Sequence, residues 1–162
     1  MLKKIVSGGQ TGADRAALDV GMECGLEIGG WIPKGRQAED GPISLRYRGL
    51  VETDSTDPSV RTNLNVRDSD ATLIVSHGPL QGGSLLTLEE ARRLGRSVLH
   101  IDLSVMSQAS AVRRLSGWLQ SVSPSILNVA GSRASEDAPI YGSVLELLRA
   151  ALPRVSRQSD YE

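Results

Sequence analysis

The chain has 162 residues, of which 40% are hydrophobic and 23% charged, and its formal net charge is −1. This length suits one domain with a proper core and is short for two, so we expect a single domain over residues 1–153 and a polar tail over 154–162. The balanced charge gives no reason to expect a nucleic-acid or membrane partner, and no apolar run reaches the length of a membrane span. Cys24 is the only cysteine, which excludes an internal disulfide and favours a reducing, cytoplasmic location.

Apolar runs typical of buried strands alternate with runs that have helical spacing. In chain order the pattern predicts a strand at 3–7, a helix from Thr11 to Cys24, strands at 28–32 and 50–53, a helix at 58–68, a strand at 71–76, a helix at 84–94, a strand at 97–102, a helix at 109–119, a strand at 126–130 and a helix at 140–152. The segment 33–49 is rich in Gly, Pro and charge and is too long for a simple connection, so we expect a functional loop there. This alternation predicts an α/β three-layer sandwich with a mostly parallel sheet, in which ligands bind at the carboxyl ends of the strands.

The first strand leads directly into a glycine-rich stretch, Ser7–Arg15, that precedes the first helix. Backbone amides at such a helix start, together with the helix dipole, favour a phosphate or another anion. The spacing of Gly8, Gly9 and Gly12 matches neither a P-loop nor the full dinucleotide fingerprint. A purely structural turn between strand and helix is therefore the alternative to a binding loop.

Polar side chains within the same stretch favour the binding interpretation. Gln10, Thr11, Asp14 and Arg15 add side-chain donors and an acceptor beside the bare amides. Thr11 and Asp14 also fit a helix-capping pattern, with the threonine as the cap.

Charged residues fill the loop that follows the second expected strand. Lys34 and Arg36 have the charge to contact phosphate, and Glu39 and Asp40 can accept hydrogen bonds from a ribose or a base. The alternative is a solvated, charged loop, which we favour for Glu39 taken alone.

A second glycine pair, Gly82 and Gly83, opens the helix after the clearest strand of the chain. Ser84 is placed to cap this helix, and Thr87 and Glu90 are neighbours on its surface. The alternative to a functional role is that Glu90 only interacts with the helix dipole, although it lies past the first turn.

Arg133 follows the last expected strand and offers a further phosphate contact. Because the two glycine pairs and Gly131 all come directly after expected strands, we expect them to converge on one edge of the sheet. His77 and His100 are isolated in the sequence, so we expect neither a metal site nor a Ser-His-acid arrangement.

Six motifs are spread over nearly the whole chain. They are Ser-Gly-Gly-Gln-Thr-Gly-Ala-Asp-Arg (7–15), Gly-Gly-Trp-Ile-Pro-Lys-Gly-Arg (29–36), Ala-Glu-Asp-Gly-Pro-Ile (38–43), Asn-Val-Arg-Asp-Ser-Asp (65–70), Gly-Gly-Ser (82–84) and Asn-Val-Ala-Gly-x-Arg (128–133). Together they resemble the bacterial family of molybdenum carrier proteins. The resemblance implies a Rossmann-like fold, in a superfamily that includes molybdenum cofactor carriers and lysine-decarboxylase-like phosphoribohydrolases. It also implies a phosphorylated pterin or nucleotide-like ligand, with molybdenum cofactor as the carried molecule, often bound by a homo-oligomer.

The phosphoribohydrolase branch of that superfamily carries Pro-Gly-Gly-x-Gly-Thr-x-x-Glu. Here residues 81–90 read Gln-Gly-Gly-Ser-Leu-Leu-Thr-Leu-Glu-Glu, without the proline and the third glycine and with the threonine one place further along. The resemblance therefore makes Glu90 a candidate acid or base only if the protein is a hydrolase. We expect a binding protein for a phosphorylated, ring-bearing small molecule; a nucleotide N-glycosidic hydrolase and a nucleotide-sensing module are the alternatives.

Overall fold

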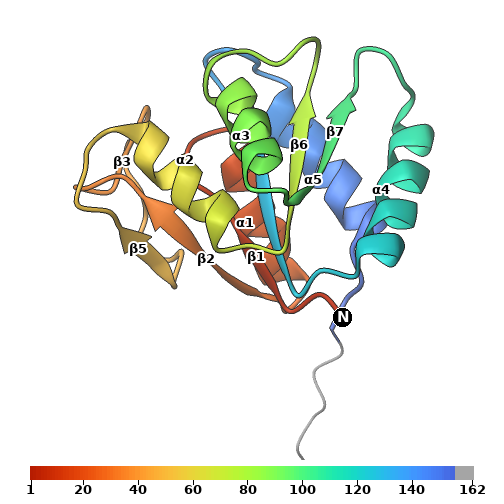
Figure 1. Cartoon of the computed structure of the whole chain (residues 1–162), viewed down its shortest axis with the longest axis horizontal. Helices are drawn as coiled ribbons and strands as arrows, with labels where there is room; N and C mark the ends of the chain where they lie inside the picture. Colours follow the sequence, from red (N-terminus) through yellow and green to blue (C-terminus); the bar gives the residue numbers. More distant parts are fainter. Residues whose placement is uncertain (156–162) are drawn as a thin grey trace, which may run out of the picture.

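The computed structural model describes residues 1–155, so residues 156–162 of the expected polar tail lie outside the described residues. Within residues 1–155 the main strands are β1 (Lys4–Val6), β2 (Glu27–Ile32), β5 (Leu50–Glu52), β6 (Ala71–Ser76), β7 (Ser97–Asp102) and β8 (Ile126–Gly131). They form one six-stranded parallel sheet in the order β5-β2-β1-β8-β6-β7 (Figure 1). A short antiparallel pair, β3 (Gln37–Ala38) and β4 (Gly41–Pro42), lies within the expected functional loop.

Helices cover both faces of the sheet. They are α1 (Ala13–Glu23), α2 (Pro58–Arg67), α3 (Gly82–Arg93), α4 (Gln108–Val122) and α5 (Ile140–Ala151). Helices α1, α4 and α5 pack on one face of the sheet, while α2 and α3 pack on the other (Figure 1). The predicted α/β three-layer sandwich, Rossmann-like with a parallel sheet, is therefore confirmed. No helix among residues 1–155 has the length and apolar character that a bilayer crossing requires.

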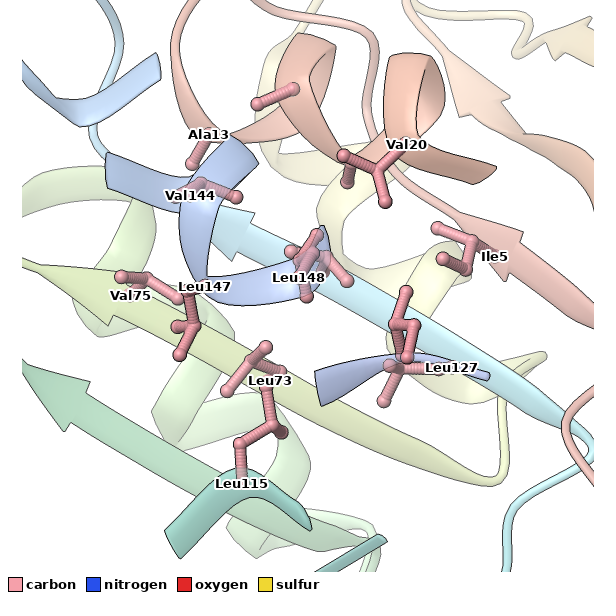
Figure 2. Packing of buried hydrophobic residues seen from close by; sticks show 14 of the residues in the cluster. Ile5, Ala13, Val20, Leu73, Val75, Leu115, Leu127, Val144, Leu147 and Leu148 are labelled. Carbon is pink, nitrogen blue, oxygen red and sulfur yellow. The ribbon is translucent and has the colours of Figure 1, made fainter. Parts of the chain in front are cut away.

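The main core lies between the sheet and the layer of α1, α4 and α5 (Figure 2). Ile5, Leu73 and Leu127 face it from three neighbouring strands, and Leu147 and Leu148 fill it from α5. The buried side chains of α1 are mostly alanines and valine, so this helix lies close to the sheet. That close approach brings the first turn of α1 up to the carboxyl ends of the central strands.

The junction of β8 with its neighbours requires a residue without a side chain. A Cβ atom on Gly131 would lie 2.4 Å from the carbonyl oxygen of Val75 and 2.6 Å from the Cβ of Ala13. Real Cβ atoms do not approach other atoms this closely, so glycine allows β6, β8 and α1 to meet at this edge.

Two helix starts differ from the sequence prediction. The N-cap of α1 is Gly12, with no side-chain cap, because the Thr11 hydroxyl bonds to Glu39 and the Asp14 carboxylate accepts from the amide of Gln10. The N-cap of α3 is Gln81. The helix begins two residues earlier than expected, so Ser84 lies inside its first turn and does not cap it. Both predicted caps were wrong.

Candidate functional site

A small cavity lies where the loop after β1, the loop after β8 and the first turn of α3 meet. It measures about 50 Å³ and is lined by Gln10, Asp14, Arg61, Gly83, Ser84, Thr87, Ala130, Gly131, Arg133 and Glu136. Sites for whole drug-sized ligands measure roughly 300–1,000 Å³. This cavity is therefore suited to one small group, such as a phosphate, rather than to an entire nucleotide.

Arg61 reaches this cavity from α2. Its guanidinium lies directly over Gly8, where an added Cβ atom would be 2.6 Å from the Nε of Arg61. One guanidinium nitrogen, Nη1, donates to the hydroxyl of Thr62 at 2.7 Å, whereas the buried Nε has no acceptor among the described residues. A buried donor without a partner costs about 1–3 kcal/mol. An anionic group in the cavity would supply the missing acceptor.

Asp14 brings a buried carboxyl group to the same wall. Only 6% of the residue is exposed, and its carboxylate accepts from the amide of Gln10 at 3.2 Å. Burial raises the pKa of this carboxyl above its usual value, and the nearby cations Arg61 and Arg133 only partly oppose that effect. The group therefore takes up a proton more readily than an ordinary aspartate, and in its protonated form it can donate to a ligand oxygen.

A second, larger cavity lies beside the first. Its volume is about 480 Å³, within the range of small-molecule sites. Ser84 and Glu136 line both cavities, and the walls of the larger one also include Ser132, His77 and Asp137. The two cavities are thus neighbouring spaces at the carboxyl ends of β6 and β8.

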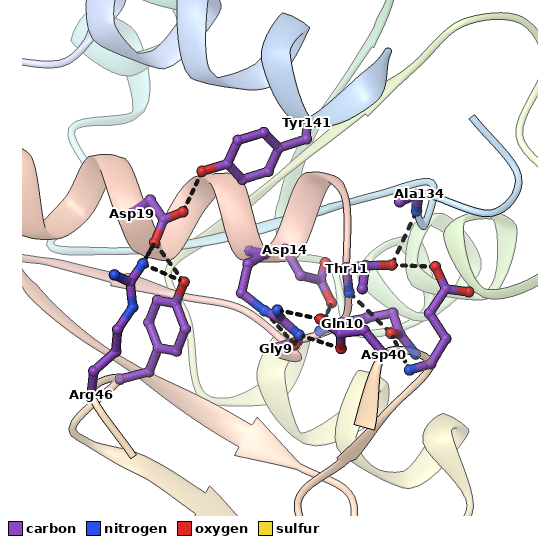
Figure 3. Close-up of polar contacts among 12 residues, drawn as sticks. Gly9, Gln10, Thr11, Asp14, Asp19, Asp40, Arg46, Ala134 and Tyr141 are labelled. Carbon is purple, nitrogen blue, oxygen red and sulfur yellow. Dashed lines mark hydrogen bonds and ion pairs between the residues drawn. The ribbon is translucent and has the colours of Figure 1, made fainter. Parts of the chain in front are cut away.

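The β3–β4 hairpin is fastened to the loop after β1 (Figure 3). Glu39 accepts hydrogen bonds from the hydroxyl of Thr11 and from the amide and hydroxyl of Ser135, the latter two at 3.0 and 2.5 Å. Arg15 pairs with Asp40 at 3.0 Å. The bonds from Ser135 and Thr11 lower the pKa of Glu39, and the bond from Arg15 lowers the pKa of Asp40. These four predicted ligand residues contact one another or the neighbouring loop, and none of them lines either cavity.

Asp19 fastens the chain just beyond the hairpin. Its carboxylate accepts from the hydroxyl of Tyr47 at 2.6 Å, from Arg46 at 2.9 Å and from the hydroxyl of Tyr141 on α5 (Figure 3). Burial, the hydrogen bond to Asp19 and the charge of Asp19 raise the pKa of Tyr141 to about 12. One carboxylate thus joins α1, α5 and the loop that follows β4.

Two predicted cations lie away from the cavities. Lys34 is exposed, and its backbone amide donates to the carbonyl of Ser55. Arg36 donates to the carbonyl oxygens of Ile43 and Ser44, at 3.2 Å in each case, and so contacts its own loop. The structure does not bring either residue to the edge where β1, β8 and α3 meet.

The remaining predicted residues divide between the cavity wall and its support. Gln10, Asp14, Gly83, Ser84, Thr87 and Arg133 line the small cavity, whereas Gly8, Gly9 and Gly12 after β1 and Gly82 at the start of α3 are not in its lining. Glu90 is on α3 one turn beyond Thr87, but it pairs with Arg93 at 2.5 Å and lines neither cavity. The ion pair with Arg93 lowers the pKa of Glu90.

Sequence reasoning missed Arg61 and Glu136. Arg61 lies on a helix with a weak apolar pattern, and only the space above Gly8 brings it to the cavity. Glu136 pairs with Arg133 at 3.3 Å in the loop after β8, which had no sequence signal beyond its charge. Among residues 1–155, no group of three or more His, Cys, Asp or Glu side chains is placed to hold a metal ion.

Comparisons with known proteins identify the family. The model of the circularly permutated YpsA SLOG family matches residues 5–152. A crystal structure described as that of a "Putative molybdenum carrier protein" from Syntrophus aciditrophicus SB has a TM-score of 0.91 and 47% sequence identity to this chain. The match covers 93% of this chain and 95% of that one, and it confirms the resemblance seen in the motifs. A search of the curated proteins gave no match. The chain belongs to the circularly permutated YpsA SLOG family.

Proposed function

We propose that the protein binds a phosphorylated, ring-bearing small molecule across the two cavities. The phosphate occupies the small cavity, and the rest of the ligand extends into the larger one past Ser84. The observation that carries this proposal is the buried Nε of Arg61, which has no acceptor among the described residues. Arg133 and the first amides of α3 add positive charge around the same space.

The sizes of the cavities support this division of the ligand. The 50 Å³ space excludes a ring together with a phosphate, whereas 480 Å³ accommodates a ring system and a sugar. The solved relative is described as a molybdenum carrier, so molybdenum cofactor, a phosphorylated pterin, is the first candidate for the carried molecule. Nucleotides have the same combination of phosphate and planar ring and form the second group to test.

Gly83 allows a test that separates ligand binding from folding. Its φ is not in the left-handed region and a Cβ atom there would meet nothing within 4 Å, so the fold itself does not need glycine at this place. Gly83 nevertheless lines the small cavity, where a side chain would intrude on a phosphate close to the backbone. Gly117 on α4 has the same open surroundings but lies away from the cavity, which makes it a matched control.

The experiment measures binding of molybdopterin, a panel of nucleoside phosphates and inorganic phosphate by calorimetry. We expect Gly83→Ala to weaken binding of the best ligand at least 10-fold, while Gly117→Ala binds like the parent protein. Both variants should be as stable as the parent or up to about 1 kcal/mol more stable, since alanine favours helix. Equal affinity in the parent and in Gly83→Ala would refute the placement of the phosphate. Release of free base from a nucleotide in the same samples would instead support the hydrolase alternative.

The oligomeric state and the cellular location of the protein remain predictions. We expect a homo-oligomer in the cytoplasm, on the family resemblance and on the single cysteine of the sequence. Sedimentation velocity at micromolar protein concentration, with and without the best ligand, tests the first of these.

A further inference from the structure

His77 meets two residues from a distant part of the chain, Asp137 and Ser143, beside the larger cavity. His77 follows β6, Asp137 lies in the loop after β8, and Ser143 is the fourth residue of α5. The Nδ1 atom of His77 lies 2.7 Å from an Oδ2 oxygen of Asp137, and its Nε2 atom lies 3.4 Å from the Oγ of Ser143. Sequence separations of 60 and 66 residues explain why no Ser-His-acid arrangement was apparent in the sequence.

The roles of the two ring nitrogens follow from their partners. An ionised carboxylate only accepts hydrogen bonds, so the Nδ1 atom of His77 must carry the proton that points to Asp137. In the neutral ring Nε2 is then an acceptor, and it faces the hydroxyl of Ser143. Acid, base and hydroxyl therefore stand in the order and with the tautomer that activate a serine nucleophile. A distance of 3.4 Å is loose, as such contacts often are before a substrate tightens them.

The surroundings of these residues fit a reacting group. The side chains of His77 and Asp137 line the larger cavity and are 30% and 14% exposed, so the base is open to a small substrate while its acid partner is largely shielded. Ser143 is half-buried at the start of α5. The amides of Tyr141 and Gly142 in the same turn have no acceptor among residues 1–155. Because side chains on a helix lean towards its N-terminus, the Ser143 hydroxyl leans towards these donors.

A second serine–histidine contact in the structure differs in the direction of the serine hydroxyl proton. The Oγ of Ser76 lies 2.7 Å from the Nε2 of His100, but the same hydroxyl donates to the carbonyl of Gly78 at 2.6 Å. Its proton is therefore directed to a backbone oxygen, and the histidine must act as the donor. That pair supports the loop after β6, whereas the hydroxyl of Ser143 is directed to a nitrogen that can accept its proton.

We propose that Ser143, His77 and Asp137 form a nucleophilic site that hydrolyses a small carboxylic ester. The Oγ of Ser143 forms a bond to the ester carbonyl carbon while its proton passes to the Nε2 of His77. The alkoxide leaves with that proton, and an acyl group remains on Ser143. Water then attacks the acyl carbon, gives its proton to His77 and releases the carboxylic acid with Ser143 restored. Asp137 stabilises the positive charge that His77 carries between these steps.

The test uses the whole chain with diisopropyl fluorophosphate and with p-nitrophenyl acetate. We expect diisopropyl fluorophosphate to phosphorylate one site, which peptide mass spectrometry locates at Ser143, and p-nitrophenolate to appear with a burst of about one equivalent. Ser143→Ala should abolish both signals. Asp137→Asn should slow labelling by about 100-fold or more, as loss of general base catalysis does. Ser121→Ala, an exposed serine on α4, is the matched control and should react like the parent.

Two results would overturn the proposal. One is an unlabelled parent protein, and the other is equal labelling of the parent and of Ser143→Ala. Thermal unfolding of each variant shows whether it is still folded. Ser143→Thr, which keeps the hydroxyl, should retain part of the labelling. Neither reagent is a nucleotide or a pterin, so the outcome does not depend on the ligand proposed above.

Discussion

Replacing Asp19 with alanine should strongly destabilise the protein, although Asp19 lines neither cavity. Its carboxylate is the acceptor for the hydroxyls of Tyr47 and Tyr141 and for the guanidinium of Arg46. Tyr47 is buried and Tyr141 half-buried, so Asp19→Ala leaves two phenol hydroxyls without their charged partner.

The expected cost follows from these contacts. A hydrogen bond to a charged group contributes about 1.5–3 kcal/mol, and the two tyrosines make one each. The Arg46 side chain is 62% exposed, so its ion pair adds at most about 1 kcal/mol. Because water can reach part of the space that the Asp19 side chain leaves, we expect each hydrogen bond to contribute near the lower end of its range, which gives a total loss of roughly 3–4 kcal/mol. For a chain of this length that is a fall in Tm of about 6–15 °C.

Urea unfolding of the parent, Asp19→Ala, Tyr141→Phe and the double variant measures this cost and the coupling between the two residues. Spectrophotometric titration should also show that the tyrosine with a pKa of about 12 moves towards the usual value of 10 in Asp19→Ala. A loss below about 0.5 kcal/mol in Asp19→Ala, the usual range for a surface change, would refute the reasoning. Additive effects of the two single changes would also contradict a direct bond between Asp19 and Tyr141.

Three further changes test other parts of the structure. Arg61→Met should weaken phosphate or ligand binding about 10- to 100-fold by calorimetry, with only a small fall in Tm, because the bond from Nη1 to the Thr62 hydroxyl is lost while the buried Nε has no partner to lose. Gly131→Ala should lower the free energy of unfolding by about 1–3 kcal/mol in urea, since its Cβ would press on Val75 and Ala13; an unchanged midpoint would contradict that clash. The folded state raises the pKa of Asp14, so its protonated form is favoured by folding and this contribution is lost as pH rises from about 4 through the raised pKa. The free energy of unfolding of the parent should therefore fall relative to that of Asp14→Asn over that pH range. A difference between the two proteins that stays constant with pH, measured by urea unfolding, would refute the upward shift of the Asp14 pKa.

The elements of this fold could be predicted because their patterns are local. The run Ala71–Ser76 is apolar on both faces, and it is a fully buried strand with partners on both sides. Gly25 and Gly95 end the helices before them, each with the positive φ that glycine tolerates. The cap of α3 was mistaken because Ser84 is a good cap by residue type, yet the chain turns into the helix already at Gln81.

The candidate site was harder to predict because it depends on which side chains have room to reach it. Arg61 enters the small cavity only because Gly8 leaves space for it, a fact of tertiary packing that no motif contains. Glu39 and Asp40 have the chemistry of ligand acceptors, but Ser135 in the loop after β8 and Arg15 on α1 already donate to their oxygens. Residue type indicates which bonds a side chain can make, whereas the fold decides which partner it meets.

The central place of β8 has a consequence for how the protein is made. A ribosome releases β1, β2 and β5, and then β6 and β7, before residues 126–131 emerge, so the nascent chain first holds two separate groups of strands. Among the strands within residues 1–155, β8 alone pairs with both β1 and β6, and until it arrives each group exposes an edge and part of its apolar face. Chains arrested near residue 120 should therefore remain sensitive to protease and recruit chaperones, whereas chains that extend past α5 should become resistant in one late step.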